Sequence, residues 1–418
     1  MSVDLKALAL DDLLARLEDS EKNISVLSSA TSDGWTPTVA WSPVEIFQVT
    51  SDATSDPTSL LEDFAEKQQK AGRLSIGYLS YDLGCILHDV ALSTNDDLQT
   101  PLLYVLSFDN WITFNKHGST LHEKSDSFSD EVKNIMKRIP RTLSAELYSK
   151  APSASWSRES YNAAYQKVHD YIEAGDIYQV NLAHRLEGTT RVHGLDIYRK
   201  VSLSSHANFQ SYIGGTGFEI ISASPERFIR IADRNIETSP IKGTRPRGAN
   251  PAQDEALRLD LETNPKDMAE LNMITDLMRN DLGVISNVGS VVVSEERILT
   301  SYPTLWHAHS TIRGQLRTDI SPIAALVSLM PGGSITGCPK KRAMEIIDEV
   351  ELMRRGIYTG SIFVIQPTGE LDSNIAIRTM IKKDDDIYLS VGGGIVYDSK
   401  QADEYDETIQ KAAAFLDL

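Results

Sequence analysis

The chain has 418 residues, of which 41% are hydrophobic, so it can bury a substantial core and form one large domain or two modest ones. Its 59 acidic residues outnumber its 41 Lys and Arg, and no basic stripe runs between aromatic residues, so the phosphates of a nucleic acid would be repelled. The 2 cysteines give neither a disulfide framework nor a thiolate metal site, and no apolar run could cross a bilayer, so we expect a cytoplasmic protein with no membrane contact.

The first part of the chain alternates short structured pieces with polar stretches. Residues 1–20 predict an acidic amphipathic helix, since the basic start and long apolar run of a signal peptide are missing. Residues 25–50 and 74–114 are rich in β-branched and aromatic residues broken by Gly, Pro and Asp, which predicts short strands. Residues 115–157 are polar around one helical piece. We therefore predict an N-terminal β-rich subdomain at 1–150 and a second domain at 151–418.

From Ser157 onward the predicted elements are denser. Apolar residues recur at helical spacing over 157–175, with Ser157 or Ser160 as the N-cap and Gly175 as the stop. The segment IYQVNLAHRL then predicts a strand. Hairpins outnumber βαβ units from there to the C-terminus, which favours an α+β fold with antiparallel sheets.

Residues 224–248, SPERFIRIADRNIETSPIKGTRPRG, have the pattern of a β-hairpin with a polar turn. If Arg234 is the centre of the turn, Glu226 and Lys242 lie eight residues to either side and face each other across the two strands. Pro240 is a residue that interrupts such a ladder. The pair is either a cross-strand salt bridge or a general acid beside a nucleophilic amine, and the second role requires an amine that is partly unprotonated.

Two acidic sets stand at helical spacing further along the chain. Asp267 and Glu270 are three residues apart, and Glu404, Glu407 and Lys411 stand at i, i+3 and i+7. Each set shares one helix face, where two carboxylates repel unless a cation lies between them. Carboxylate oxygens without His or Cys suit Mg²⁺. The alternative is two solvated acidic faces, with Lys411 in an ordinary i,i+4 pair with Glu407.

Glycine-rich turns predict two places where backbone can approach a ligand closely. MPGGSITGCPKKR leads into a helix near Pro339, and its backbone N–H groups could bind a carboxylate; Cys338 stands where a phosphate-binding loop requires lysine. The run Gly392–Gly394 allows a second close approach.

Single polar residues between these motifs could bind an anion. Arg378 could clamp a carboxylate and Tyr358 could donate to the same group, although packing or a surface ion pair is the alternative for each. His307 and His309 lack the spacing of a zinc-protease motif.

Eight motifs stand in one order across residues 155–418: SPERF, PIKGTRPRG, DLMRND, PGGSITG, GSI, IAIRT, GGGIV and EYDET. In this order and with these gaps they resemble the chorismate-utilising enzymes, the family of the anthranilate, aminodeoxychorismate, isochorismate and salicylate synthases. The resemblance implies two subdomains whose antiparallel sheets pack as a sandwich with helices outside, and a Mg²⁺-dependent enzyme that acts on chorismate.

The resemblance also implies roles for single residues. Glu270 and Glu407 would ligate Mg²⁺, with Asp267 and Glu404 in support. Glu226 would protonate the departing C4 hydroxyl of chorismate. The remaining matched positions would contact the substrate: Thr244, His307, Tyr358, Arg378, Gly392 and Lys411.

Two positions distinguish the members of the family. Water-adding relatives have a lysine base where this chain has Gln179, and the ammonia-using members have glutamine. Anthranilate synthases usually have alanine at the position of Lys242, whereas aminodeoxychorismate synthases have lysine. The resemblance therefore implies that Lys242 adds at C2 of chorismate and that ammonia displaces it by attack at C4. The alternatives are anthranilate synthase, isochorismate synthase, which Gln179 opposes, and a non-catalytic binding subunit.

Partners follow from the same resemblance. Neither Cys85 nor Cys338 lies in a nucleophile turn of the GxCxG type, and no amidotransferase domain follows before Leu418. We therefore expect a separate glutamine amidotransferase subunit in a heterodimer. Ser28 and Ser29, in a VLSS segment where relatives bind tryptophan, leave tryptophan as a candidate ligand of the N-terminal part. His309 is an addition to the family pattern with no role that we can assign.

Overall fold

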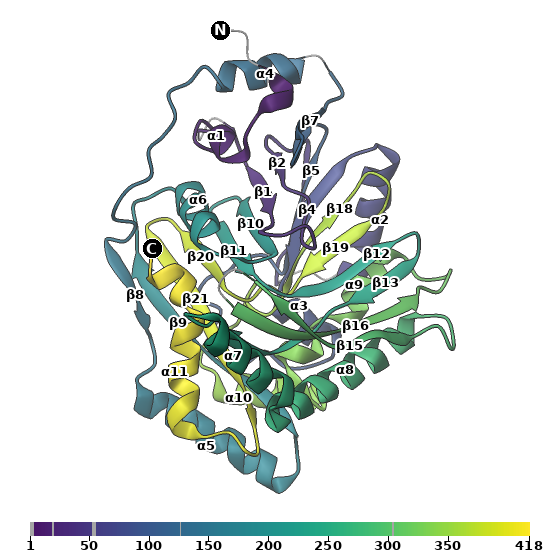
Figure 1. The fold of residues 1–418 in the computed structure, drawn as a ribbon. Helices are drawn as coiled ribbons and strands as arrows, with labels where there is room; N and C mark the ends of the chain where they lie inside the picture. Colours follow the sequence, from purple (N-terminus) through teal and green to yellow (C-terminus); the bar gives the residue numbers. More distant parts are fainter. Residues whose placement is uncertain (1–3, 19–20, 52–55, 126, 303–304) are drawn as a thin grey trace.

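Two antiparallel sheets form the centre of the molecule (Figure 1). The computed structural model describes residues 4–18, 21–51, 56–125, 127–302 and 305–418. Within these residues the first sheet has 11 strands in the order β17-β9-β21-β20-β11-β10-β1-β2-β6-β7, with β8 paired to β9. The second has 10 strands in the order β14-β16-β13-β12-β19-β18-β4-β5-β3, with β15 paired to β16. The expected α+β fold with antiparallel sheets is confirmed.

The strands have the following bounds. Those of the first sheet are β1 Ser25–Ser28, β2 Thr38–Ala40, β6 Trp111–Asn115, β7 Gly118–His122, β8 Lys150–Ala154, β9 Gln179–Thr189, β10 Phe209–Gly214, β11 Glu219–Ser224, β17 Gly337–Cys338, β20 Thr379–Lys383 and β21 Asp386–Val396. Those of the second are β3 Glu45–Val49, β4 Leu74–Leu79, β5 Leu103–Phe108, β12 Arg227–Ala232, β13 Asn235–Thr238, β14 Ile241–Pro246, β15 Val292–Ser301, β16 Leu305–Gln315, β18 Ser361–Ile365 and β19 Leu371–Asn374.

The helices connect these strands. The two 3-10 turns are η1 Leu5–Ala7 and η2 Gly333–Ile335. The α-helices are α1 Leu10–Leu14, α2 Pro57–Lys70, α3 Tyr81–Leu87, α4 Ser127–Ile135, α5 Arg158–Ala174, α6 Gly194–Ser204, α7 Pro251–Thr263, α8 Pro265–Ile285, α9 Pro322–Leu329, α10 Lys340–Val350, α11 Gln401–Lys411 and α12 Ala413–Leu416. No helix in the described part of the chain is both long enough and apolar enough to cross a membrane.

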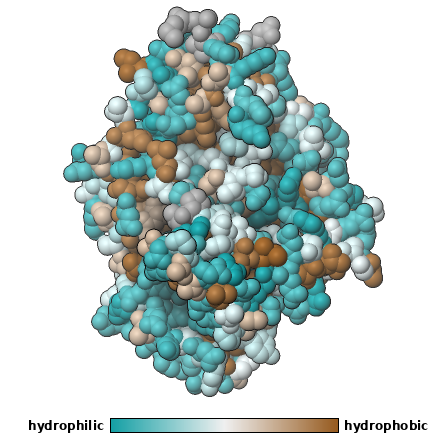
Figure 2. Space-filling model, in the orientation of Figure 1, coloured by the Kyte–Doolittle hydropathy of each residue, from teal (hydrophilic) through white to brown (hydrophobic). Residues whose placement is uncertain are grey.

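The sheets pack face to face, and helices cover their outer faces. One buried cluster joins Leu27 and Ile213 of the first sheet to Ile76, Tyr104 and Ile362 of the second. A second cluster lies between the first sheet and α1, α4, α6 and α12, and a third lies between the second sheet and α2, α8 and α9. The outer surface seen in Figure 2 is largely hydrophilic with separate hydrophobic patches. The expected sandwich with helices outside is confirmed.

Strands from both halves of the chain pair with each other. β1 pairs with β10 in the first sheet, and β4 pairs with β18 in the second. The division at residue 150 therefore stays a prediction, and it would separate two parts of the chain that share both sheets.

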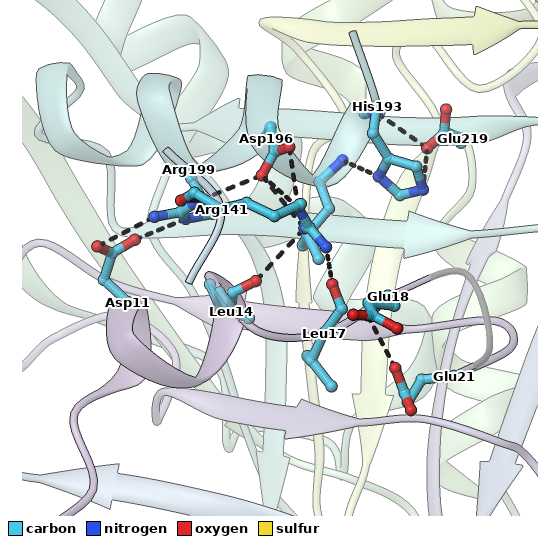
Figure 3. A network of polar contacts seen from close by, with 12 residues as sticks. Asp11, Leu14, Leu17, Glu18, Glu21, Arg141, His193, Asp196, Arg199 and Glu219 are labelled. Atoms are coloured by element: carbon cyan, nitrogen blue, oxygen red, sulfur yellow. Dashed lines mark hydrogen bonds and ion pairs between the residues drawn. The ribbon is translucent and has the colours of Figure 1, made fainter. Parts of the chain in front are cut away.

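The N-terminal segment is held by arginines from later in the chain (Figure 3). The helix predicted over 1–20 is wrong for residues 4–18, since the backbone at Leu8 and Ala9 is extended between η1 and α1; residues 1–3 and 19–20 lie outside the described part. Arg199 pairs with Asp11 at 2.9 Å, and Arg141 donates to the carbonyl of Leu17. Burial of Leu8 and these contacts favour a bent segment over one continuous helix.

The local predictions for α5 are confirmed. Ser157 Oγ accepts a hydrogen bond from the Ser160 N–H, and Gly175 ends the helix with φ +85°, a conformation that glycine adopts without strain. The strand predicted after it is β9.

Candidate active site

Glu226 lies between β11 and β12 and is almost fully buried, with 7% of its surface exposed. Its backbone carbonyl accepts a hydrogen bond from the Ile375 N–H, and Ser334 Oγ donates to its carboxyl oxygen Oε1 at 3.0 Å. Burial raises the pKa of Glu226 to about 7, against the opposing effects of Ser334, the Lys242 charge and the Ile241 N–H. This carboxyl can therefore hold a proton at neutral pH.

Lys242 reaches the same region by a different route from the one predicted. The hairpin turn consists of Asp233 and Arg234, both with positive φ, and Ala232 pairs with Asn235. The predicted centre at Arg234 is therefore wrong, because a continued ladder would place Glu226 opposite Ile241. The ladder does not continue, because β13 ends at Thr238 and the chain enters β14, which pairs with β16 instead.

The Lys242 amine lies near polar groups from two other elements. Its Nζ is 3.8 Å from Glu270 Oε2 of α8, and the side chain is 19% exposed. A methyl group on Gly394 of β21 would lie 3.4 Å from this Nζ and 3.0 Å from Nε2 of Gln179, which is 1% exposed. The predicted acid, amine and glutamine thus meet where the β9–β21 end of the first sheet approaches β14 of the second.

Gly392 and Gly394 of β21 form a surface without side chains, which we call the glycine floor. Side chains alternate along a strand, so Gly392 and Gly394 face one side and Gly393 the other. A methyl group on Gly392 would lie 2.8 Å from the Tyr358 hydroxyl, and Lys411 Nζ donates to the Gly392 carbonyl at 3.0 Å. Burial raises the pKa of Tyr358 to about 12, so it is a hydrogen-bond donor at neutral pH.

The first acidic set lies at the start of α8. Asn264 caps this helix by accepting hydrogen bonds from the N–H groups of Lys266 and Asp267. Glu270 is shared by two lysines, at 3.8 Å from Lys242 and 3.9 Å from Lys266. Asp267 is engaged by Arg245 at 2.8 Å. Glu270 therefore points toward the amine, and Asp267 points to an arginine.

The second acidic set lies on α11. Glu407 pairs with Lys411 at 2.8 Å; burial would raise the pKa of Glu407, but the charges of Lys411 and Lys242 lower it. Glu404 is 4% exposed, and burial together with the Glu407 charge raises its pKa. A methyl group on Gly393 would lie 3.2 Å from Glu404 Oε2, so Glu404 approaches β21 from the face opposite Gly392 and Gly394.

These acids fit a hard cation by their chemistry. Among the residues that the structure describes, no three His, Cys, Asp or Glu side chains lie close enough together to hold a metal ion as they stand. Glu404 is nevertheless a buried carboxylate beside another carboxylate, an arrangement that a divalent cation stabilises. Lys242 and Lys266 supply the positive charge beside Glu270. Glu270 and Glu407 both lie where the Lys242 charge acts on them, so they are the donors that could hold Mg²⁺, with Glu404 beside Glu407.

A cavity of about 280 Å³ opens beside this region and is lined by Arg378, His307 and Lys411, with Asn208 and Tyr302 among its other walls. Arg378 is partly buried, and burial lowers its pKa. No acidic side chain of the described residues pairs with its guanidinium. A guanidinium without a partner at the wall of a cavity is suited to bind an anion.

His307 is held as a neutral ring. β14 and β16 pair Thr244 with His307, and the Thr244 hydroxyl lies 2.8 Å from His307 Nδ1. Burial lowers the pKa of His307 to about 4, and the charge of Arg378 acts in the same direction. The ring can line a site for an organic substrate without carrying charge.

Sequence reasoning missed several residues of this region. Ser334 stands in the PGGSITG motif, but its hydrogen bond to Glu226 depends on a long-range contact. Lys266 had no signal in the sequence apart from its i,i+4 spacing to Glu270.

Two residues named from the sequence lie as follows. His309 lies opposite Ile241, with Thr300 Oγ1 3.5 Å from its Nδ1. Ser28, in the candidate tryptophan segment, is hydrogen-bonded to Tyr198 and Gln210.

Comparison with known proteins gives one family for nearly the whole chain. Residues 23–417 match the family described as chorismate binding enzyme. The chain is 38% identical to an aminodeoxychorismate synthase component 1 of Klebsiella aerogenes over 82% of this chain and 76% of that protein. It is 34% identical to the aminodeoxychorismate synthase component 1 of Bacillus subtilis, over 81% of this chain and 75% of that protein. It is also 33% identical to an anthranilate synthase component 1 of Pseudomonas aeruginosa, over 86% of this chain and 79% of that protein.

Solved structures have the same fold. Anthranilate synthase component I of Streptococcus pneumoniae superposes with a TM-score of 0.81 at 27% identity, covering 91% of each chain. The menaquinone-specific isochorismate synthase MenF of Escherichia coli superposes with a TM-score of 0.77 at 16% identity, covering 98% of this chain and 92% of that one, and at this identity the likeness concerns the fold alone.

Proposed function

The chain belongs to the chorismate-binding enzyme family, and from this premise we propose that it converts chorismate and ammonia to 4-amino-4-deoxychorismate. One observation carries the proposal. The Lys242 amine and the Glu226 carboxyl, whose pKa is raised to about 7, lie close enough for the Lys242 charge to act on Glu226. Such a pair can supply a nucleophile and a proton to one substrate.

The first step would be an allylic substitution on chorismate. Unprotonated Lys242 Nζ forms a bond to C2, the two conjugated double bonds of the ring both shift by one position, and the C4–O bond breaks. Glu226 gives its proton to the departing hydroxyl, which leaves as water, and Glu226 becomes a carboxylate. Neutral His307 and the glycine floor of β21 would border the ring, while Arg378 and Tyr358 would hold a carboxylate.

The second step would reverse the shift. Ammonia forms a bond to C4, the C2–N bond to Lys242 breaks, and the amine leaves neutral. The new ammonium group gives a proton to the Glu226 carboxylate, which restores the acid. The sum of both steps is chorismate plus ammonia giving 4-amino-4-deoxychorismate plus water. Covalent catalysis divides one difficult substitution into two easier ones.

We propose Mg²⁺ as the cofactor, held by Glu270, Glu404 and Glu407 with Asp267 in support. When bound, the ion would neutralise the substrate carboxylate and draw electron density from the ring. The support for this assignment is Glu404, a buried carboxylate whose pKa the neighbouring Glu407 charge raises further, and the absence of softer ligands from the set.

We propose that ammonia comes from a separate glutamine amidotransferase subunit, since several relatives bear the name component 1. Purified chain should use ammonium directly and glutamine only with such a subunit present. We also propose a cytoplasmic location, where the free thiols of Cys85 and Cys338 would stay reduced. A tryptophan site near Ser28 remains a lesser proposal, because that hydroxyl already has two partners.

Anthranilate synthesis is the second candidate, favoured by the similar identity to anthranilate synthases and by Gln179, which the resemblance gives to both ammonia-using members. One assay separates the two. The protein is incubated with chorismate, Mg²⁺ and ammonium, and then with the lyase that releases p-aminobenzoate from 4-amino-4-deoxychorismate. Formation of p-aminobenzoate supports the proposal, and anthranilate as the sole product refutes it.

A further inference from the structure

Strand β9 presents a second amide to the same space as Gln179. Asn181 is two residues further along, so its side chain shares the face of Gln179. It pairs with Gly394 of β21, the glycine beside the Lys242 amine. Ala183, the next residue on this face, pairs with Gly392. Asn181 therefore lies at the centre of the glycine floor.

The Asn181 side chain is buried with an unused donor. The residue is 8% exposed, and its Nδ2 makes no hydrogen bond to any residue that the structure describes. The amide is near enough to the Tyr358 hydroxyl to act on it as a donor, which partly offsets the rise in the pKa of Tyr358 that burial causes. Such a contact would use one of the two N–H groups of Nδ2 and leave the other without an acceptor. An unpaired amide N–H away from water is costly, so such a group calls for a ligand acceptor.

The backbone of Asn181 already has its structural partners. Its N–H donates to the Thr336 carbonyl at 2.8 Å, and its carbonyl accepts from Arg355 at 2.5 Å. Any residue other than proline could make both contacts at this position. The backbone of Asn181 therefore makes the contacts that hold this part of β9 in place, and the side-chain carboxamide is not needed for them.

We propose that Asn181 is a substrate-binding residue whose Nδ2 donates a hydrogen bond to an oxygen atom of chorismate lying over Gly392 and Gly394. This inference rests on the proposed function. Chorismate carries two carboxylates, a hydroxyl and an ether oxygen, so it offers acceptors in every direction. Lys242 and Gln179 border one side of this space and Tyr358 the other, and the Asn181 donor lies between them.

The test replaces Asn181 with leucine, which has nearly the same volume and no donor. The same change at Asn134, an exposed residue of α4, is the control. For each protein, kcat/KM for chorismate is measured with Mg²⁺ and saturating ammonium, and the melting temperature is measured without substrate. Asn181→Leu should lower kcat/KM by about tenfold to a hundredfold, the cost of leaving a buried oxygen of the substrate without its hydrogen bond, and should not lower the melting temperature.

The outcomes distinguish a failure of the Asn181 proposal from a failure of the proposed function. If the wild type consumes chorismate and Asn181→Leu stays within twofold of it, the inference alone is overturned. It is equally overturned if the loss disappears once rates are expressed per folded molecule. If Asn181→Leu does not fold, Asn181→Ala decides by the same thresholds. A wild type that does not consume chorismate overturns the proposed function, and this inference with it.

Discussion

The hydrogen bond from Ser334 to Glu226 gives a sharp prediction for the pH dependence of catalysis. It stabilises the charged carboxylate, and it opposes the burial that raises the pKa of Glu226 to about 7. A hydrogen bond to a charged group contributes about 1.5 kcal/mol at the lower end of its range, which corresponds to about one pKa unit. Ser334→Ala should therefore raise the pKa of Glu226 from about 7 to roughly 8.

The consequence is a shift of the alkaline side of the rate profile. The proposed first step needs protonated Glu226, so the rate falls as pH rises through the pKa of Glu226. At pH 7.5 the protonated fraction should rise from about a quarter in the wild type to about three quarters in Ser334→Ala. The assay is kcat/KM for chorismate against pH, with total ammonium adjusted so that free ammonia stays constant.

The control for this shift is Ser328→Ala on α9. Among the described residues, the Ser328 hydroxyl donates to the backbone carbonyl of Ala325 and to no other group, so its removal should leave the profile unchanged. An alkaline limb that stays in place in Ser334→Ala, or moves to lower pH, would refute the role of Glu226 as the acid.

Three further changes test the packing around the site. Because burial raises the pKa of Glu226 from 4.5 to about 7, ionising its carboxyl in the folded protein costs free energy of folding. This cost is absent below about pH 4.5 and reaches roughly 3 kcal/mol above about pH 7. Glu226→Gln removes the cost and should therefore raise the melting temperature at pH 8. Glu351→Gln breaks the buried pair with Arg355, 2.6 Å long, and should cost about 3–5 kcal/mol in denaturant unfolding; a loss below 1 kcal/mol would contradict this reading. Gly394→Ala would place a methyl group 3.4 Å from the proposed nucleophile and should lower kcat at least tenfold, whereas Gly283→Ala, in open space on α8, should leave kcat unchanged.

Local signals predicted much of the fold. The caps Ser157 and Gly175 fixed both ends of α5, because a capping hydroxyl and a glycine at positive φ act within one helical turn. The N-terminal helix was misjudged for the opposite reason. Its shape depends on Arg141 and Arg199, which reach it from parts of the chain more than a hundred residues away.

The site was only partly open to sequence reasoning. Glu226 and Lys242 lie near each other, but through pairing of β14 with β16 and not through one hairpin, and register of this kind depends on long-range strand order. The helical spacing of Glu404 and Glu407 could be read directly from the sequence, whereas the burial of Glu404 could not. Asn181 carried no signal, because its significance lies in an empty hydrogen-bonding position that only packing reveals.

Mass spectrometry of the trapped protein tests the central claim most directly. The enzyme is mixed with chorismate and Mg²⁺ without ammonia, quenched in acid and digested. A covalent nucleophile predicts an adduct of chorismate less one water on the peptide that contains Lys242, lost in Lys242→Ala and discharged when ammonium is added before the quench. Turnover to 4-amino-4-deoxychorismate with no adduct on Lys242 at any time point would contradict the account.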